Sequence, residues 1–319
     1  MDNLTHSLVG ALLGQAGLKR TTGLAMPALI IGANLPDVDA ACFFWLKGTE
    51  HLAFRRGITH GPPALVLLPL ILAGLLWAFD RWQTKRGAGR FGRPEARLPV
   101  RFGWLYAMAF IGCLSHPFFD WLNVYGIRLL EPFSSRWFYG DTLFIIDVWL
   151  WALLTGSVWW SRRREKAGGE WMRPARVGIA VGLAYIGVNG AISEFERDRV
   201  AETLPYLECS ETATVCDWDV IASPVPIVPW QREMITDHPA GHWTIGTQVV
   251  GDCRLPDFTE TRQTNSQLDA FLFWSRAPFA ARAPDGSVIL YDARFYDPRA
   301  RGRFSVALPD VECEELPAP

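Results

Sequence analysis

Long apolar runs separated by short polar segments constrain the fold of this chain more than any other feature. A helix that spans a membrane needs roughly 20 predominantly apolar residues, and only helices and closed barrels satisfy their backbone hydrogen bonds in lipid. The apolar runs have lengths near that value and occupy residues 4–18, 22–46, 64–80, 102–122, 142–160 and 175–193. The sequence therefore predicts a mainly α-helical, polytopic membrane bundle over residues 1–194.

Composition agrees with this interpretation. Of the 319 residues, 50% are hydrophobic and 20% are charged, which is too apolar for an ordinary soluble protein and too charged for one that lies in the membrane throughout. Many of the 15 Trp stand near the ends of apolar runs, where aromatic belts form at membrane surfaces. The net charge of −2 gives no basis for nucleic-acid binding.

Residues 195–319 lose the long apolar runs and gain short alternating stretches, at 218–221, 242–245 and 287–291. A hairpin-type turn at 283–287 precedes the last of them, so we predict a small antiparallel β domain. Four of the six cysteines lie here. A disulfide between Cys209 and Cys216 is plausible and would leave Cys253 with Cys313, although spacing alone does not fix the pairing. His238 and His242 flank Pro239 and Gly241 in a loop, which favours surface histidines over metal ligands.

The basic residues of the connecting segments predict the orientation of the bundle. Lys and Arg accumulate on the cytoplasmic side of a membrane. Segments 81–101 and 161–176 are strongly basic, and Lys19 and Arg20 end the first run. With these three segments inside, alternation of the runs places the C-terminal domain outside.

His116 and Asp120 close the run 102–122 with two side chains that lipid disfavours. They are four residues apart, so a helix puts them on one face. An imidazole and a carboxylate at bilayer depth are costly unless they bind something. The pair either forms a hydrogen bond that holds helices together or binds a ligand.

Three further segments, at 4–7, 36–39 and 56–60, place His or Asp in or beside apolar runs. The predicted topology brings all of these side chains to the outer membrane face, which favours one site over scattered structural residues. Three His and three Asp suit one or two divalent metal ions. The predicted metal ligands are His6, Asp37, Asp39, His60, His116 and Asp120.

The same segments resemble the YdjM-like family over about residues 1–160. The resemblance rests on Thr5-His6-Ser7, Leu35-Pro36-Asp37-Val38-Asp39, Arg56-Gly57-Ile58-Thr59-His60-Gly61 and Ser115-His116-x3-Asp120-x2-Asn123-x2-Gly126. Members of the family are bacterial inner-membrane proteins described from their motifs as metal-dependent hydrolases, and some are regulated by the LexA repressor. The additional helix and the C-terminal domain look like those of longer, YfhP-like members. The resemblance implies a multi-pass protein of the bacterial cytoplasmic (inner) membrane.

One position departs from the family pattern. Relatives often read His-Arg-Gly-x-Thr-His, whereas Arg55 stands here in place of the first His. Either that His is not an essential ligand or this chain binds fewer metal ions. The scattered His and Asp ligands also give a weaker likeness to zinc-dependent phospholipase C enzymes.

The ligand set predicts metal-dependent hydrolysis. A Zn²⁺ ion, or Mn²⁺ in its place, would activate water and polarise the bond to be cleaved. We assign catalytic roles to Asp39 and Asp120, one Asp being free to bridge two ions or act as general base, and to Arg56, which could hold a phosphate oxygen. Arg128 and Arg136 offer the same chemistry, and a lipid-headgroup anchor explains all three arginines equally well. Asp141 and Asp147 lie near the same predicted face, and Asp147 is a secondary candidate.

A site at headgroup level suggests an ester or phosphoester of a membrane lipid or lipid-linked molecule as substrate. Two other classes compete with a hydrolase: a metal or proton transporter, and a non-catalytic envelope scaffold. A transporter should carry ionisable residues through the whole bilayer depth, whereas the inner halves of these runs are almost purely apolar. A scaffold predicts that the six candidate ligands bind no metal.

Overall fold

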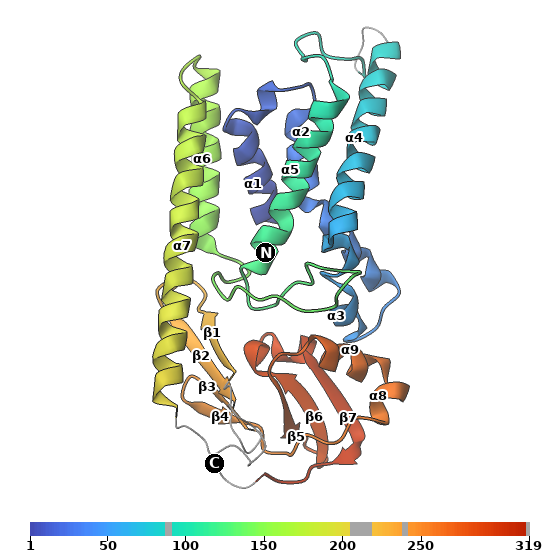
Figure 1. The fold of residues 1–319 in the computed structure, drawn as a ribbon, viewed down its shortest axis with the longest axis vertical. Helices are drawn as coiled ribbons and strands as arrows, with labels where there is room; N and C mark the ends of the chain where they lie inside the picture. Colours follow the sequence, from blue (N-terminus) through green and yellow to red (C-terminus); the bar gives the residue numbers. More distant parts are fainter. Residues whose placement is uncertain (87–90, 205–218, 238–241, 317–319) are drawn as a thin grey trace. The chain divides into compact units, whose positions relative to one another are not determined.

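The computed structural model describes residues 1–86, 91–204, 219–237 and 242–316. They form two compact units (Figure 1), one made of Met1–Asp39 with Arg56–Val188 and the other of Ala40–Arg55 with Asn189–Pro319. The first unit is helical and the second contains both β-sheets. The division between the units falls within one long helix, after Val188, and the second unit also includes residues 40–55, which no sequence pattern predicts.

Helices of the first unit run through nearly all of the predicted apolar stretches. They are α1 (Asn3–Gln15), α2 (Ala25–Asn34), α4 (Pro62–Lys85), α5 (Phe102–Trp121), α6 (Val148–Lys166) and α7 (Met172–Thr203), the last of which continues into the second unit. The run 22–46 is broken, as its Pro36 predicts: α2 ends at Asn34 and a 3₁₀ helix, Leu35–Phe44, follows. A further 3₁₀ turn, Ile58–His60, leads into α4.

Among the described residues, four segments are long and apolar enough to cross a membrane: Ala25–Phe44, Pro62–Lys85, Phe102–Trp121 and Met172–Thr203. The prediction of six runs near spanning length is therefore too generous. The 13 residues of α1 rise only about 20 Å, less than the roughly 30 Å of a hydrocarbon core. Helix α6 ends in Arg163, Arg164 and Lys166, which shortens its apolar part.

The three predicted basic segments gather at one end of the first unit. A cavity there is lined by Lys19, Arg97, Glu165 and Trp171 among others, and the Lys19 ammonium lies 4.2 Å from the centre of the Trp171 ring. Figure 1 shows α6 antiparallel to α7, so that their connection lies at the same end as the α4–α5 connection. The common end that charge patterning predicts is therefore present.

Small residues bring α1, α2 and α5 close together. A Cβ added to Gly10 of α1 would lie 2.7 Å from the carbonyl oxygen of Leu29, and one added to Gly112 of α5 would lie 2.5 Å from the same oxygen. Only glycine permits backbones to approach this closely. Helix α2 is therefore held between α1 and α5 through the backbone of Leu29.

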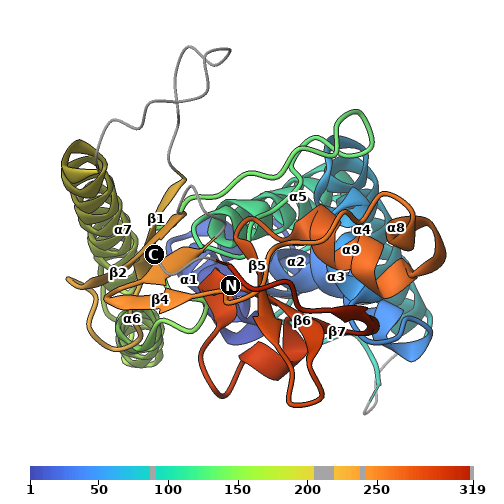
Figure 2. The same cartoon turned by 90° about the horizontal axis from the view of Figure 1, so that it is seen from below.

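The second unit holds two separate antiparallel sheets, which Figures 1 and 2 show side by side. The strands are β1 (Val220–Pro224), β2 (Arg232–Asp237), β3 (Trp243–Ile245) and β4 (Gln248–Val250) in one sheet, and β5 (Pro278–Arg282), β6 (Ser287–Asp292) and β7 (Ser305–Glu312) in the other. Short helices α3 (Glu50–Phe54), α8 (Thr261–Thr264) and α9 (Ser266–Trp274) complete the unit. The predicted β domain and the hairpin between β5 and β6 are confirmed. One prediction is wrong: His242 is buried, and its ring bonds to the Gly251 carbonyl. His238, Cys209 and Cys216 lie outside the described residues.

Cys253 and Cys313 form the disulfide that the sequence allowed, across a separation of 60 residues. A link that closes a loop of this length stabilises a domain by about 2–5 kcal/mol. We therefore expect a reductant to lower the unfolding temperature of the purified protein by more than that of the variant Cys253→Ser/Cys313→Ser, which retains Cys209 and Cys216. Free thiols at both positions, in protein trapped under non-reducing conditions, would contradict the bond.

Candidate metal centre

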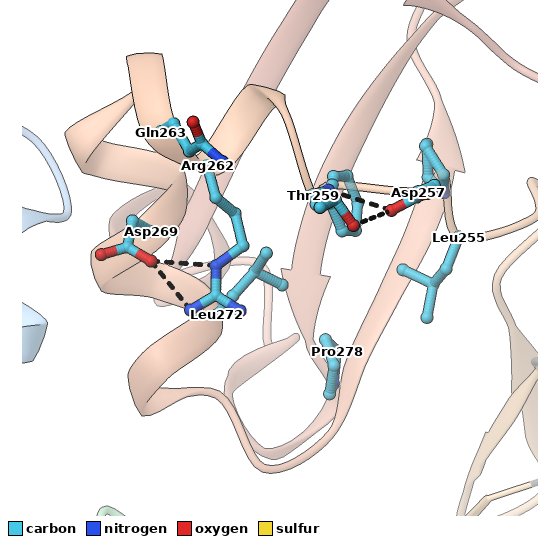
Figure 3. Close-up of a pocket in the computed structure, with 10 residues that line it drawn as sticks. Leu255, Asp257, Thr259, Arg262, Gln263, Asp269, Leu272 and Pro278 are labelled. Carbon is cyan, nitrogen blue, oxygen red and sulfur yellow. Dashed lines mark hydrogen bonds and ion pairs between the residues drawn. The ribbon is translucent and has the colours of Figure 1, made fainter.

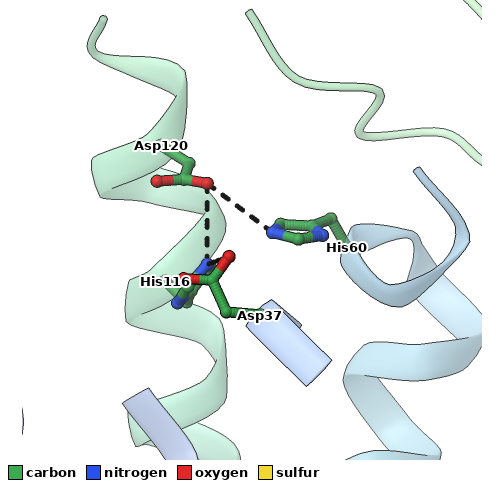
Figure 4. Close-up of side chains that lie close together, drawn as sticks. All are labelled: Asp37, His60, His116 and Asp120. Atoms are coloured by element: carbon green, nitrogen blue, oxygen red, sulfur yellow. Dashed lines mark ion pairs between the residues drawn. The ribbon is translucent and has the colours of Figure 1, made fainter. Parts of the chain in front are cut away.

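Helix α5 places His116 and Asp120 on one face, as their spacing predicts. Nε2 of His116 lies 3.5 Å from Oδ2 of Asp120, and both side chains are essentially inaccessible to solvent. Figure 4 shows the pair directed towards His60, which precedes α4, and towards Asp37, which follows α2. The site is thus assembled from three segments of the first unit.

Asp37, His60, His116 and Asp120 form a group that we call the four-residue cluster. One ligand atom from each lies within 4.8 Å of all the others. Nε2 of His60 is 3.6 Å from Oδ2 of Asp120, and Nε2 of His116 is 3.8 Å from Oδ1 of Asp37. Ligands about 2.1 Å from a tetrahedral ion are themselves about 3.4 Å apart. The separations therefore suit one small divalent ion.

The atoms that converge in the four-residue cluster are also poorly satisfied. Nε2 of His60 and Nε2 of His116 are buried without a hydrogen-bond partner among the described residues, whereas Oδ2 of Asp120, which is equally buried, is ion-paired with Nε of Arg56 at 2.9 Å. Buried polar atoms are normally paired, because an unpaired one costs about 1–3 kcal/mol. A cation bound among these atoms would satisfy both imidazole nitrogens and give Oδ2 of Asp120 a second positive partner.

A backbone carbonyl fixes the protonation of His116. Nδ1 of His116 lies 2.7 Å from the carbonyl oxygen of Ala33. A carbonyl only accepts, so Nδ1 carries the proton and Nε2 of the neutral ring presents its lone pair to the cluster. Ala33 is in the last turn of α2. Pro36, three residues after Ala33, has no N–H that could donate to the Ala33 carbonyl. The break in the helix thereby supplies the group that orients the ligand.

The hydroxyl of Thr59 fixes the protonation of His60. Its hydroxyl lies 3.2 Å from Oδ2 of Asp39 and 2.9 Å from Nδ1 of His60. The hydroxyl donates to the carboxylate, which can only accept, and in turn accepts the Nδ1 proton of His60. Burial lowers the pKa of the His60 imidazole, which favours the neutral ring. Nε2 of His60 then faces Asp120 as an acceptor.

Asp39 and His6 lie next to the four-residue cluster rather than within it. Asp39 contacts the Nδ1 side of His60, at 3.6 Å, and accepts a hydrogen bond from the backbone N–H of Arg56. The His6 ring stacks on His116 with centroids 3.8 Å apart, and its Nε2 is 3.3 Å from Oδ1 of Asp120. The amino group of Met1 pairs with that same oxygen. Metal ligation by Asp39 and His6 stays a prediction.

Arg56 is held inside the site. Its Nε lies 2.9 Å from Oδ2 of Asp120, and its terminal nitrogen donates to Asn123 and to the Gly126 carbonyl. The guanidinium also stacks 4.5 Å from the Tyr125 ring. Arg56 has a positive φ of 53°, which aims its N–H at Asp39. These contacts hold Asp120 in place, and they use Nε and one terminal nitrogen of the guanidinium that the sequence analysis assigned to a substrate phosphate.

The remaining candidates from the outer loop have structural contacts. Arg128 pairs with Glu131 at 2.6 Å and lies over the Trp137 ring. Arg136 is exposed, with its guanidinium 5.5 Å from the Phe138 ring. Asp147 caps the start of α6 by accepting from the Leu150 N–H, and it also accepts from Tyr185. Asp141 is buried. In the described part of the chain, none of these four belongs to the four-residue cluster.

Thr59 and Asn123 have roles that residue type alone does not reveal. Both stand in the quoted motifs, but neither is a typical metal ligand. Asn123 accepts from Arg56 and from the Tyr125 N–H, and donates to the Asp120 carbonyl. The sequence signal that could have identified them is their position, one residue before His60 and three residues after Asp120.

The second unit has a separate cavity of about 960 Å³ (Figure 3). Its charged side chains are paired within the cavity: Arg262 pairs with Asp269 at 2.8 Å, and Thr259 donates to Asp257. No histidine lines it among the described residues. This arrangement stabilises the loop before α9 and offers no comparable ligand set.

Comparison with known proteins agrees with the motif resemblance. The model of the YdjM inner membrane protein family matches residues 1–196. An uncharacterised protein of Bacillus subtilis (strain 168), YfhP, is 29% identical over 146 residues, which is 43% of this chain and 39% of that protein. The chain thus matches less than half the length of this relative. No solved structure matches it.

The family match covers the four-residue cluster and the helices that hold it. Together with four candidate spans, it places this protein in the inner membrane. The chain belongs to the YdjM inner membrane protein family.

Proposed function

We propose that this protein is a membrane-bound, metal-dependent hydrolase of an ester or phosphoester in a lipid or lipid-linked substrate. The observation that carries the proposal is the convergence of four ligand atoms, three of them from buried residues. Ala33 and Thr59 orient the two imidazoles from the side away from the cluster. Oriented neutral imidazoles and carboxylates are the usual ligands of catalytic Zn²⁺, and they also accept Mn²⁺.

Each residue has a distinct role in this proposal. Asp37, His60, His116 and Asp120 would hold the ion, which would supply Lewis-acid activation of the scissile bond and of water. Asp39 is a positioning residue, because it orients His60 through Thr59. Asp120 is held by Arg56 and lies close to both imidazoles, so it serves in this proposal as a fixed ligand rather than as a proton acceptor.

The surroundings of the cluster support an apolar substrate. Asp37 is the least buried of the four ligands, with a side chain 10% exposed, so access is from its side. Val38, next to Asp37 in the chain, is 48% exposed, and Ile58, two residues before His60, is 54% exposed. Phe133 of the outer loop is 78% exposed. Exposed apolar side chains beside a polar site are typical of contact with lipid.

The test combines metal content with hydrolysis. Full-length protein purified without chelators should carry about one Zn²⁺ or Mn²⁺ per chain, and should release product from ester or phosphoester lipids in mixed micelles. Chelation should abolish turnover, and the ion should restore it. Protein that retains no metal after both ions are supplied would favour a scaffold and reject the proposal. Protein that binds the metal but hydrolyses no lipid ester would reject the hydrolase activity and leave the metal site standing.

The basic segments at the end that includes Lys19, Arg97 and the α6–α7 connection predict which side carries the second unit. If these cations are cytoplasmic, the C-terminal unit lies outside. We expect a reporter that is active only in the cytoplasm to be silent when fused after Pro319, and the same reporter inserted within 87–90 to be active. The reverse pattern would place the site at the cytoplasmic face.

A further inference from the structure

One face of α6 changes from apolar to cationic along its length. The residues of this face recur at spacings of three and four, so they form one row along the helix. Together with a side chain of α1 they line a cavity of about 560 Å³. We call this cavity the basic groove, and its lining residues are Leu8, Thr155, Val158, Trp159, Arg162, Arg163 and Lys166.

The three cations of the basic groove have no carboxylate partner within the part of the chain that the structure describes, and all three are exposed. Other cations at this end are neutralised: Lys19 pairs with Glu165, and Arg97 with Asp80 at 3.0 Å. Like charges three and four residues apart on a helix repel one another. An anion between them would turn that repulsion into attraction.

The other half of the basic groove is apolar. Leu8 and Val158 are half-buried walls, and Trp159 is 60% exposed with the Arg163 guanidinium 5.5 Å from its ring centre. Tryptophan is enriched at the headgroup level of a membrane, where one part of its ring meets lipid and another meets water. The groove therefore passes from hydrocarbon depth to headgroup depth.

We propose that the basic groove binds an anionic phospholipid, with its phosphate among Arg162, Arg163 and Lys166 and an acyl chain along Leu8 and Val158. A free phosphate ion would use the cations but leave the apolar walls without a role. The volume of the cavity is within the range of small-molecule sites, about 300–1,000 Å³. Basic pockets beside membrane helices recognise anionic headgroups by the same charge complementarity. The groove shares no residue with the four-residue cluster, so the proposal is independent of hydrolysis.

The test uses the full chain in nanodiscs of equal parts phosphatidylglycerol and phosphatidylcholine. After detergent extraction, we expect native mass spectrometry to show phosphatidylglycerol retained by the wild type at least tenfold over phosphatidylcholine. Arg162→Gln/Arg163→Gln/Lys166→Gln should lose this preference, whereas the matched control Arg164→Gln, one residue outside the groove, should keep it. Each single substitution should lower the preference two- to threefold. The single variants replace the triple variant in the test if the triple variant does not fold. Thr155→Trp, which fills the apolar half, should also lower it.

Two results would overturn the proposal. Retention of phosphatidylglycerol by a folded triple variant at the wild-type level would show that the groove is not the binding site. Displacement of the lipid by inorganic phosphate at equimolar concentration would show that the cations recognise a free anion rather than a lipid.

Discussion

Replacement of His116 by Ala should remove stoichiometric metal from the purified protein and, with it, any hydrolytic activity. The substitution deletes one of four ligands whose lone pair is directed into the cluster. Loss of a group that only orients a ligand costs 10–100-fold in metal affinity, so loss of the ligand itself should cost more than about 100-fold. Metal content by mass spectrometry and affinity by competition with a chelator measure both effects.

A graded series separates this result from a general loss of structure. Thr59→Val keeps the shape of the side chain but removes the hydroxyl between Asp39 and His60, so we expect a 10–100-fold loss of affinity with the ion still bound at saturation. Ser115→Ala is the matched control, because its hydroxyl bonds to the Gly112 carbonyl within α5 and not to the cluster. His116→Ala also leaves the Ala33 carbonyl unpaired, which costs about 1–3 kcal/mol of stability. Equal metal binding by His116→Ala and the wild type would show that the pair is only a buried hydrogen bond.

Replacement of Arg56 by Met should destabilise the metal-free protein strongly and the metal-loaded protein much less. Asp120 is buried, and Arg56 is its closest cationic side chain. Removal of one partner of a buried ion pair costs about 3–5 kcal/mol when the other charge is left uncompensated, and the Met1 amino group, which pairs with Oδ1 of Asp120, offsets part of this cost. A divalent ion beside Asp120 would provide that compensation. We therefore expect metal to raise the unfolding temperature of Arg56→Met by more than that of the wild type.

Arg55 provides the control for this experiment. It is the adjacent arginine, and its guanidinium lies 5.6 Å from the Phe43 ring rather than beside Asp120. Arg55→Met should change stability little and should not alter the response to metal. If Arg56→Met is equally unstable with and without Zn²⁺, the ion does not bind next to Asp120 and the four-residue cluster is not its site.

The helices and the position of the site follow closely from sequence, because lipid imposes strict rules. His116 and Asp120 share a face owing to helical periodicity, and Pro36 breaks the second run owing to its missing N–H. The charge of three connecting segments also predicts that the basic residues share one end. Each of these inferences depends on neighbours within one segment or on a rule that holds for the whole bilayer.

Interactions between distant segments were not predictable in the same way. In the sequence Arg56 looks like a free cation. Only the fold shows that its guanidinium pairs with Asp120 and donates to Asn123 and to the Gly126 carbonyl. The orienting group of His116 is a backbone carbonyl, for which no residue type is diagnostic. His242 looked like a surface loop residue because its Gly251 partner lies nine positions away.

The close approach of α2 and α5 gives the metal centre a dependence on helix spacing. Gly112 meets the backbone of Leu29, and one turn further along both helices His116 meets the backbone of Ala33. A single added methyl group at Gly112 would have to separate the two backbones, and would lengthen the bond that orients the imidazole. Metal affinity in this protein can thus be tuned through the distance between two helix axes, by substitutions that leave every ligand unchanged.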